Sequence, residues 1–143
     1  MSDAAPYVIA VAVGGIGDQC GYVLLAERAG RRRVFGPFFV ESPTSIAADV
    51  WAATYEGIAR ACRMSLATTA RREVLVALLG AVQALDRAGV GDSRPLVAAA
   101  ARALTETGST LRWARRHESE TMAAAHDALA EAGTRALREE TGS

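Results

Sequence analysis

The sequence predicts an α/β fold in which a mixed five-stranded sheet carries helices on both faces. Near the N-terminus, three strand-like runs follow one another with short links, which is typical of an antiparallel meander. Helical and strand-like segments then alternate to the C-terminus, as they do in α/β proteins. Half of the 143 residues are hydrophobic and the formal net charge is zero. This composition predicts one globular domain over 1–143, with frayed tails at 1–6 and 139–143.

The predicted meander occupies the first 40 residues. Its first strand, over 7–13, is β-branched and aromatic and stops at two glycines. The second and third strands are expected at 21–27 and 34–40, with a turn over 30–33 between them. Pro37 lies inside the third run. Because proline cannot donate to a strand ladder, it predicts an edge position or a bulge.

A helix is predicted over 46–63, directly after a polar stretch that holds Thr44 and Ser45. Hydroxyl side chains accept hydrogen bonds from the free N–H groups at a helix start. The apolar run over 73–79 predicts a central strand that is buried on both faces. It leads directly into a short predicted helix over 80–89.

The last third of the chain is predicted to hold two longer helices and the fifth strand. Pro95 suits the first turn of a helix over 95–107, and a glycine follows where that helix ends. A strand over 110–115 and a helix over 120–138 complete the predicted order. The sheet is therefore expected to combine the meander with two further strands.

Every basic side chain is an arginine, and the sequence contains neither lysine nor asparagine. This usage is typical of a GC-rich coding bias, and it leaves no asparagine amide to hydrogen-bond a base edge. Zero net charge offers no long-range attraction for nucleic acid, although a local basic patch could still exist.

Cys20 and Cys62 lie far apart in the sequence and lack a metal-binding spacing, which indicates reduced thiols in a cytoplasmic protein. The apolar run at 7–13 follows no basic segment, so it is not expected to be a signal peptide. No apolar stretch reaches the roughly 20 residues of a membrane span. The sequence thus predicts a soluble, cytoplasmic protein without a membrane partner.

The segment RWARRHESETMAAAHDALAEAGTRAL, over 112–137, places Asp127 ten residues after His117. A strand that leads to a histidine, followed by a helix with an aspartate, resembles the C-terminal end of type 1 ribonuclease H. The order of the predicted elements is similar to that family along essentially the whole chain. The resemblance implies a ribonuclease H-like fold. It also implies, for an active member, cleavage of RNA in RNA/DNA hybrids with Mg²⁺ or Mn²⁺, and otherwise no cofactor is expected.

Apolar residues replace two of the carboxylates that this resemblance implies. Two-metal hydrolysis needs several carboxylates around a pair of divalent ions. Val13 stands before Gly14, where the family's first strand carries an aspartate, and Leu79 stands before Gly80, where the fourth strand ends in one. Neither side chain can coordinate Mg²⁺, which prefers oxygen ligands. If Val13 and Leu79 cluster as an apolar plug in one pocket, the cleft is sealed.

Asp49 and Asp127 remain as candidate metal ligands and, with His117, as vestigial catalytic candidates. Asp49 lies near the position of a glutamate in the family's first helix; alternatively, it complements the helix dipole. Asp127 matches the ligand in the last helix, or it pairs with a nearby arginine. His117 matches the family's loop histidine, or it is an ordinary loop residue.

Three other residues are weaker candidates. Asp18 lies five residues after Val13 and would replace the lost aspartate only by bending back; otherwise it is a solvated turn residue. Asp86 is too far along its predicted helix to compensate. His126 faces a different direction from its neighbour Asp127 and is expected at the surface or in the core.

The resemblance also suggests a nucleic-acid interface. Thr44 and Ser45 could hold a phosphate at a helix start, and Arg115 with Arg116 forms a basic cluster. Two further arginine clusters lie at 31–33 and 71–72. The alternative interpretation is that arginine serves everywhere as ordinary solvated charge.

Two functional hypotheses follow, beside a small-molecule or scaffold role unrelated to nucleotides that the sequence neither supports nor excludes. In the first, the chain is a catalytically degenerate ribonuclease H-like module that binds a protein partner, a second copy of itself, or structured nucleic acid such as an RNA/DNA hybrid or structured RNA. In the second, it is an active ribonuclease H whose rearranged site uses Asp18, Asp49, Asp127 and His117. The alanine-rich last two helices are candidate surfaces for a homodimer.

Overall fold

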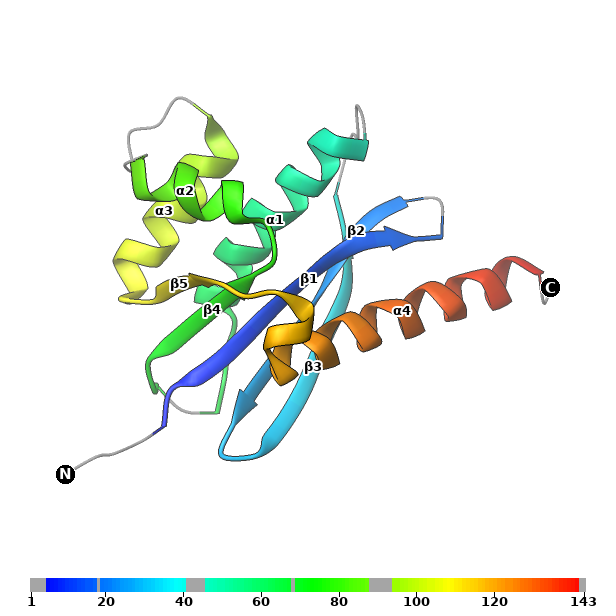
Figure 1. Ribbon diagram of the computed structural model, residues 1–143, viewed down its shortest axis with the longest axis horizontal. Helices are drawn as coiled ribbons and strands as arrows, with labels where there is room; N and C mark the ends of the chain where they lie inside the picture. The colour runs from blue at the N-terminus through cyan, green and yellow to red at the C-terminus, as the bar shows by residue number, and fades with distance from the viewer. Residues whose placement is uncertain (1–4, 18, 41–45, 68, 88–93, 142–143) are drawn as a thin grey trace.

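The computed structural model describes residues 5–17, 19–40, 46–67, 69–87 and 94–141. These residues form a five-stranded sheet in the order β3-β2-β1-β4-β5, with helices on both faces (Figure 1). The sheet is mixed, because the meander pairs antiparallel whereas β1, β4 and β5 run parallel. The predicted ribonuclease H-like fold class is therefore confirmed.

The meander consists of β1 (Tyr7–Ile16), β2 (Gln19–Arg28) and β3 (Arg31–Phe39). The arginines that were expected in a turn belong to β3, because the turn is confined to Ala29 and Gly30. Both turn residues have positive φ, 53° and 77°. A two-residue hairpin with this geometry follows the natural twist of its strands. β3 is an edge strand, as Pro37 predicts.

The parallel half of the sheet consists of β4 (Arg72–Val76) and β5 (Thr110–Trp113). The side chains of 74–76 are buried, which confirms that β4 is a central strand. The prediction that this strand runs to Leu79 is wrong. β4 ends at Val76, and Leu79 is the first residue of α2 (Leu79–Arg87). An apolar run cannot by itself distinguish a buried strand from the start of a helix.

Three other helical segments complete the described chain. α1 (Ile46–Arg63) and α3 (Pro95–Thr107) have the predicted bounds, and Gly108 ends α3 with a φ of 64°. A short 3₁₀ turn, η1 (Arg116–Glu118), leads into α4 (Glu120–Thr141). α4 thus continues helically through part of the tail that was expected to fray. Among the described helices, none has the length and apolar character needed to cross a membrane.

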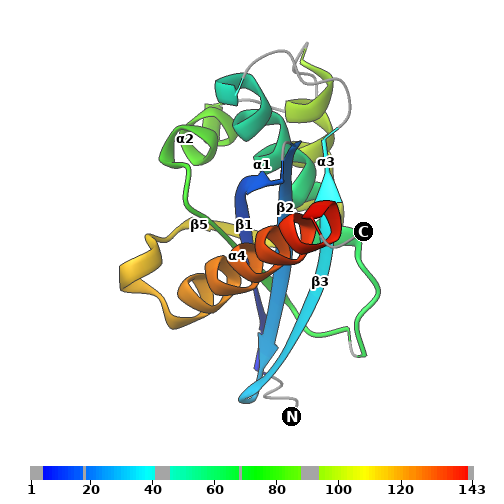
Figure 2. The ribbon, with the colours of Figure 1, turned by 90° about the vertical axis from the view of Figure 1, so that its right-hand side faces the viewer.

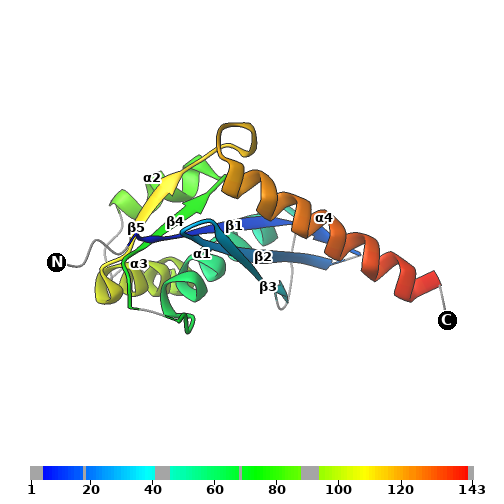
Figure 3. The same cartoon turned by 90° about the horizontal axis from the view of Figure 1, so that it is seen from below.

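The sheet separates two apolar cores, and Figures 2 and 3 show helices on both of its faces. α1, α2 and α3 contribute to the larger core, and α4 packs alone on the opposite face. Small residues let α4 approach β1 closely. A Cβ added to Gly14 would lie 3.1 Å from Leu129 Cδ2, which is tighter than an ordinary van der Waals contact.

The sheet therefore has two chemically distinct ends, which we name by strand direction. At the carboxyl edge, β1, β4 and β5 end and α2 begins. At the amino edge, β1 and β4 begin and the β2–β3 hairpin turns (Figure 1).

Candidate functional site

A cavity of about 150 Å³ lies at the carboxyl edge, between β1, the β4–α2 link, α1 and α4. It is lined by Val11, Val13, Val50, Thr54, Ala77, Leu78 and His126. Thr54 is almost fully buried, and its hydroxyl donates to Val50 O at 2.7 Å. The cavity is thus mostly apolar, and among the described residues that line it the imidazole of His126 is the one ionisable group.

The structure places Val13 in this cavity but not Leu79. Val13 and Leu79 do not meet in this cavity, because β4 ends at Val76 and Leu79 begins α2. Leu78 lines the cavity in its place, and the side chain of Leu79 is 40% exposed at the start of α2. The apolar character expected at this position is therefore present, but a neighbouring residue provides it.

Aromatic side chains fix the two sides of the β4–α2 link. Trp113 Nε1 donates to Ala77 O at 3.0 Å, which ties the link to the end of β5. Trp51, on α1, packs over Gly80. A Cβ added there would meet the indole at 2.6 Å. Trp51 remains 38% exposed, so it and Leu79 form apolar surface at this edge.

His126 and Asp127 differ sharply in environment although they are adjacent on α4. His126 lines the cavity, with Nδ1 3.0 Å from Met122 O. The carboxylate of Asp127 is 77% exposed and lies 3.4 Å from Arg116 Nη2. In this structure Asp127 therefore pairs with a nearby arginine, which is the alternative to a role as metal ligand.

The other described candidates lie on the outer surface of the carboxyl edge. His117, in η1, is exposed, with Nε2 3.8 Å from Glu118 Oε1. Arg115 lies over the Trp113 ring at 4.8 Å from its centroid and 3.9 Å from Glu118. The two arginines of this cluster therefore each have a carboxylate within 4 Å, counting the contact of Arg116 with Asp127.

Four sequence candidates lie outside the described residues. They are Asp18, Thr44, Ser45 and the side chain of Asp49. The backbone of Asp49 belongs to α1, one residue before the cavity-lining Val50.

The described residues at this edge do not fit a pair of magnesium ions. Mg²⁺ takes oxygen ligands in near-octahedral geometry, whereas the cavity lining offers one buried hydroxyl and one imidazole. Within the part of the chain that the structure describes, no three His, Cys, Asp or Glu side chains gather closely enough to hold a metal ion.

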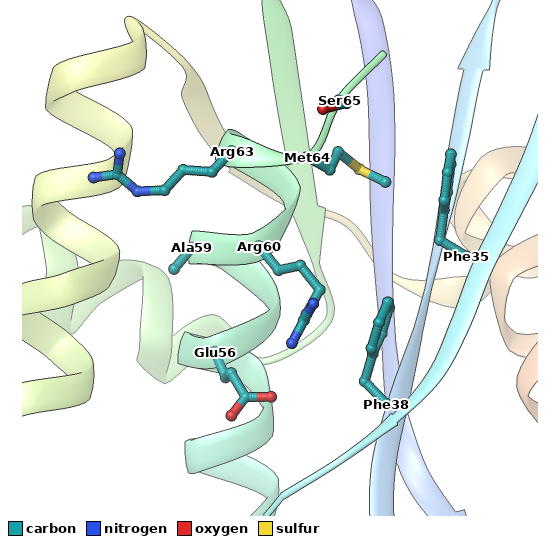
Figure 4. Close-up of a pocket in the computed structure, with 8 residues that line it drawn as sticks. All are labelled: Phe35, Phe38, Glu56, Ala59, Arg60, Arg63, Met64 and Ser65. Atoms are coloured by element: carbon teal, nitrogen blue, oxygen red, sulfur yellow. The ribbon is translucent and has the colours of Figure 1, made fainter.

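A second cavity, of about 480 Å³, lies between α1 and β3 (Figure 4). Beneath it, Tyr22 donates to Glu56 Oε2 at 2.5 Å and accepts from Arg60 Nε at 2.9 Å. The Arg60 guanidinium also lies 4.0 Å from the centroid of the Phe38 ring. Burial, and then the hydrogen bond to Glu56, raise the pKa of Tyr22 well above its ordinary value, so this hydroxyl stays protonated.

Sequence reasoning missed His126, although the spacing of α4 contains the relevant signal. Met122, Ala125 and Leu129 are buried and follow helical spacing. At about 100° per residue, His126 lies beside this buried stripe and Asp127 lies nearly opposite it. The family pattern drew attention to the aspartate, whereas the helix periodicity indicates the histidine.

Comparisons with known proteins give a likeness of fold only. No family model matches the sequence, and no curated protein matches it. Among solved structures, the chain is similar to the N-terminal RNase H domain of Rv2228c from Mycobacterium tuberculosis, solved as a fusion with maltose binding protein. The two are 19% identical, the match covers 93% of this chain and 99% of that chain, and the TM-score is 0.47. A likeness at this level does not extend to activity, substrate or site residues.

Proposed function

We propose that this chain is a catalytically degenerate ribonuclease H-like module that acts by binding and not by hydrolysis. The lining of the carboxyl-edge cavity carries the proposal. Val13 and Leu78 line this cavity, whereas two-metal hydrolysis needs several carboxylates around its ions. Asp127, the acid expected there, points to solvent and pairs with Arg116. Such a module needs no cofactor.

The chemistry of the carboxyl edge favours a protein surface as the partner, supplied by another protein or by a second copy of this chain. Trp51 and Leu79 expose apolar surface, and exposed aromatic side chains are typical anchors of protein interfaces. Arg115 and Arg116 each have a carboxylate within 4 Å, which weakens their attraction for phosphate. An RNA/DNA hybrid or structured RNA is therefore the less favoured partner at this edge.

A cleavage assay on labelled RNA/DNA hybrid in Mg²⁺ or Mn²⁺ tests the loss of catalysis. We expect no cleavage above the buffer blank. Turnover that disappears in Asp127→Asn would contradict the proposal and support the rearranged site of Asp18, Asp49, Asp127 and His117.

Light scattering across a range of protein concentrations tests self-association through the carboxyl edge. If the partner is a second copy, the mass of the wild type rises with concentration, and Trp51→Glu with Leu79→Glu abolishes this rise. Val34→Glu is the matched control, because Val34 is 49% exposed on β3, away from this edge. A mobility shift with RNA/DNA hybrid that depends on Trp51 and Leu79 would instead contradict the preference for protein.

A further inference from the structure

The β2–β3 hairpin places three arginines on one face of the amino edge. Arg28 lies opposite Arg31 in the strand register, and Arg33 lies opposite Ala26. Ala26 belongs to the core beneath α1, and side chains alternate along a strand, so Arg28, Arg31 and Arg33 share the α1 face. Arg32 points to the other face, where it pairs with Glu27.

Within the described part of the chain, the three arginines on the α1 face have no ion pair with a carboxylate. Like charges directly opposite one another in a sheet are destabilising, so the Arg28–Arg31 pair costs stability when no anion is present. This cost would be relieved by an anionic ligand.

The same arginines line a cavity of about 380 Å³. Its described lining consists of Tyr7, Ala26, Arg28, Arg31, Arg32, Arg33, Leu66 and Ala67, and none of these residues is acidic. Neighbouring groups hold two of the guanidinium groups in place. Arg28 Nε donates to Ala5 O at 2.8 Å and lies over the Tyr7 ring, and Arg33 lies 4.8 Å from the centroid of the Phe35 ring. Arginines fixed in this way lose less entropy when they bind phosphate.

The arginine cavity adjoins the cavity between α1 and β3. Phe35 lines the cavity between α1 and β3, and its ring contacts the guanidinium group of Arg33, which lines the arginine cavity. Residues 64 and 65 line the former cavity, and residues 66 and 67 line the latter. The second cavity, of about 480 Å³, combines apolar side chains with polar ones: Phe35, Phe38, Ala59 and Met64 line it together with Glu56, Arg60, Arg63 and Ser65 (Figure 4). Its volume lies in the range of about 300–1,000 Å³ that is typical of small-molecule sites.

We propose that the amino edge binds a nucleotide, free or as one unit of a single strand. The phosphate groups lie on Arg28, Arg31 and Arg33, since guanidinium groups bind phosphate oxygens through charge-assisted, bidentate hydrogen bonds. The base enters the cavity between α1 and β3, against Phe35 and Met64. This site is distinct from the carboxyl edge, and its function does not depend on the binding module proposed there.

The binding of ATP and of a short labelled single-stranded DNA, measured separately by titration calorimetry and fluorescence anisotropy, tests the proposal. We expect at least one of the two ligands to bind at low salt. Binding of ATP indicates that the site takes a free nucleotide, and binding of the DNA alone indicates that it takes a nucleotide within a single strand. For the single strand, three phosphate contacts predict about 20-fold weaker binding at about 200 mM salt than at about 50 mM. Arg31→Glu with Arg33→Glu weakens binding about 100-fold, because each charged hydrogen bond contributes about tenfold or more.

The matched control is Arg87→Glu with Arg102→Glu, which changes the net charge equally on exposed helical positions of α2 and α3. This control retains wild-type affinity within about twofold if the amino edge is the site. Failure of both ligands to bind at low salt would overturn the proposal, and so would equal losses in the two double variants. Inorganic triphosphate tests the role of the base: affinity equal to that of ATP would overturn the assignment of the second cavity.

Discussion

The two ends of this sheet have opposite chemistry although the same strands build them. At the carboxyl edge the cavity is small and mostly apolar, and the nearby arginines have carboxylate partners. At the amino edge the cavity is larger, and three arginines share one face without an acidic partner among the described residues. A family resemblance directs attention to the carboxyl edge, whereas the unpaired charge lies at the amino edge.

The difference in charge between the two edges follows from how many elements pack together at each one. Three elements converge at the carboxyl edge, where α1 and α4 close on β1 and the β4–α2 link. Apolar side chains there gain stability from burial. The amino edge ends in a two-residue hairpin, and a hairpin tip leaves the flanking side chains exposed to solvent. Charge is therefore tolerated at the amino edge at little cost in hydration, and it costs far more inside the carboxyl-edge cavity.

Val13→Asp has the largest expected effect on stability, because it introduces a carboxylate into the carboxyl-edge cavity. Val13 lines the carboxyl-edge cavity among apolar side chains. We expect the free energy of unfolding to fall by about 2–3 kcal/mol, since the new charge is poorly hydrated there. Urea unfolding monitored by circular dichroism measures the change.

The same substitution at Val34 is the matched control at the other end of the sheet. Val34 is 49% exposed on β3, so Val34→Asp changes strand propensity without burying charge. We expect a loss of no more than about 1 kcal/mol. Equal losses at the two positions would show that the edges do not differ in this way.

Tyr22→Phe gives an intermediate effect and tests the polar network beneath the cavity between α1 and β3. The variant removes the hydroxyl that bridges Glu56 and Arg60, which predicts a loss of about 1–2 kcal/mol. Burial and the hydrogen bond to Glu56 raise the pKa of Tyr22 in the folded chain. The unfolded chain therefore loses this proton first, and stability falls as the pH rises above about 10.

Thermal unfolding of the two proteins between neutral pH and pH values above about 10 separates these contributions. The wild type loses more stability than Tyr22→Phe over this interval, because the variant has no proton to release at this position. An identical pH dependence in both proteins would contradict the raised pKa. A larger loss in the wild type indicates that the hydrogen bonds of Tyr22 with Glu56 and Arg60 hold this region, which adjoins the arginine cavity, in one arrangement.

Much of the fold was predictable from the sequence, because its signals are local. The bounds of α3 follow from Pro95 and Gly108, those of α1 follow from helical spacing, and the edge position of β3 follows from Pro37. The end of β4 was not predictable, since one apolar run continues through a strand, a link and the first turn of α2.

The candidate sites were predictable only in part. The apolar residue at position 13 can be read from the sequence, whereas the presence of Leu78 in the same cavity depends on where β4 ends. The arginines at 31–33 were identified as a basic cluster, but their sorting onto two faces requires the strand register. A register shift of one residue would exchange those faces, so the composition of the cluster alone cannot predict a cavity.

Asp127→Asn gives the smallest expected effect and decides what this acid contributes. Its carboxylate is 77% exposed and lies 3.4 Å from Arg116, and exposed ion pairs of this kind contribute little because water screens them. We expect the free energy of unfolding, measured in urea, to change by less than about 0.5 kcal/mol with or without Mg²⁺. An aspartate that held a metal ion would behave differently, because Mg²⁺ would stabilise the wild type and not the variant. A Mg²⁺-dependent gap between the two proteins would therefore contradict the apolar description of the carboxyl edge, and its absence would leave Asp127 as one half of a surface ion pair.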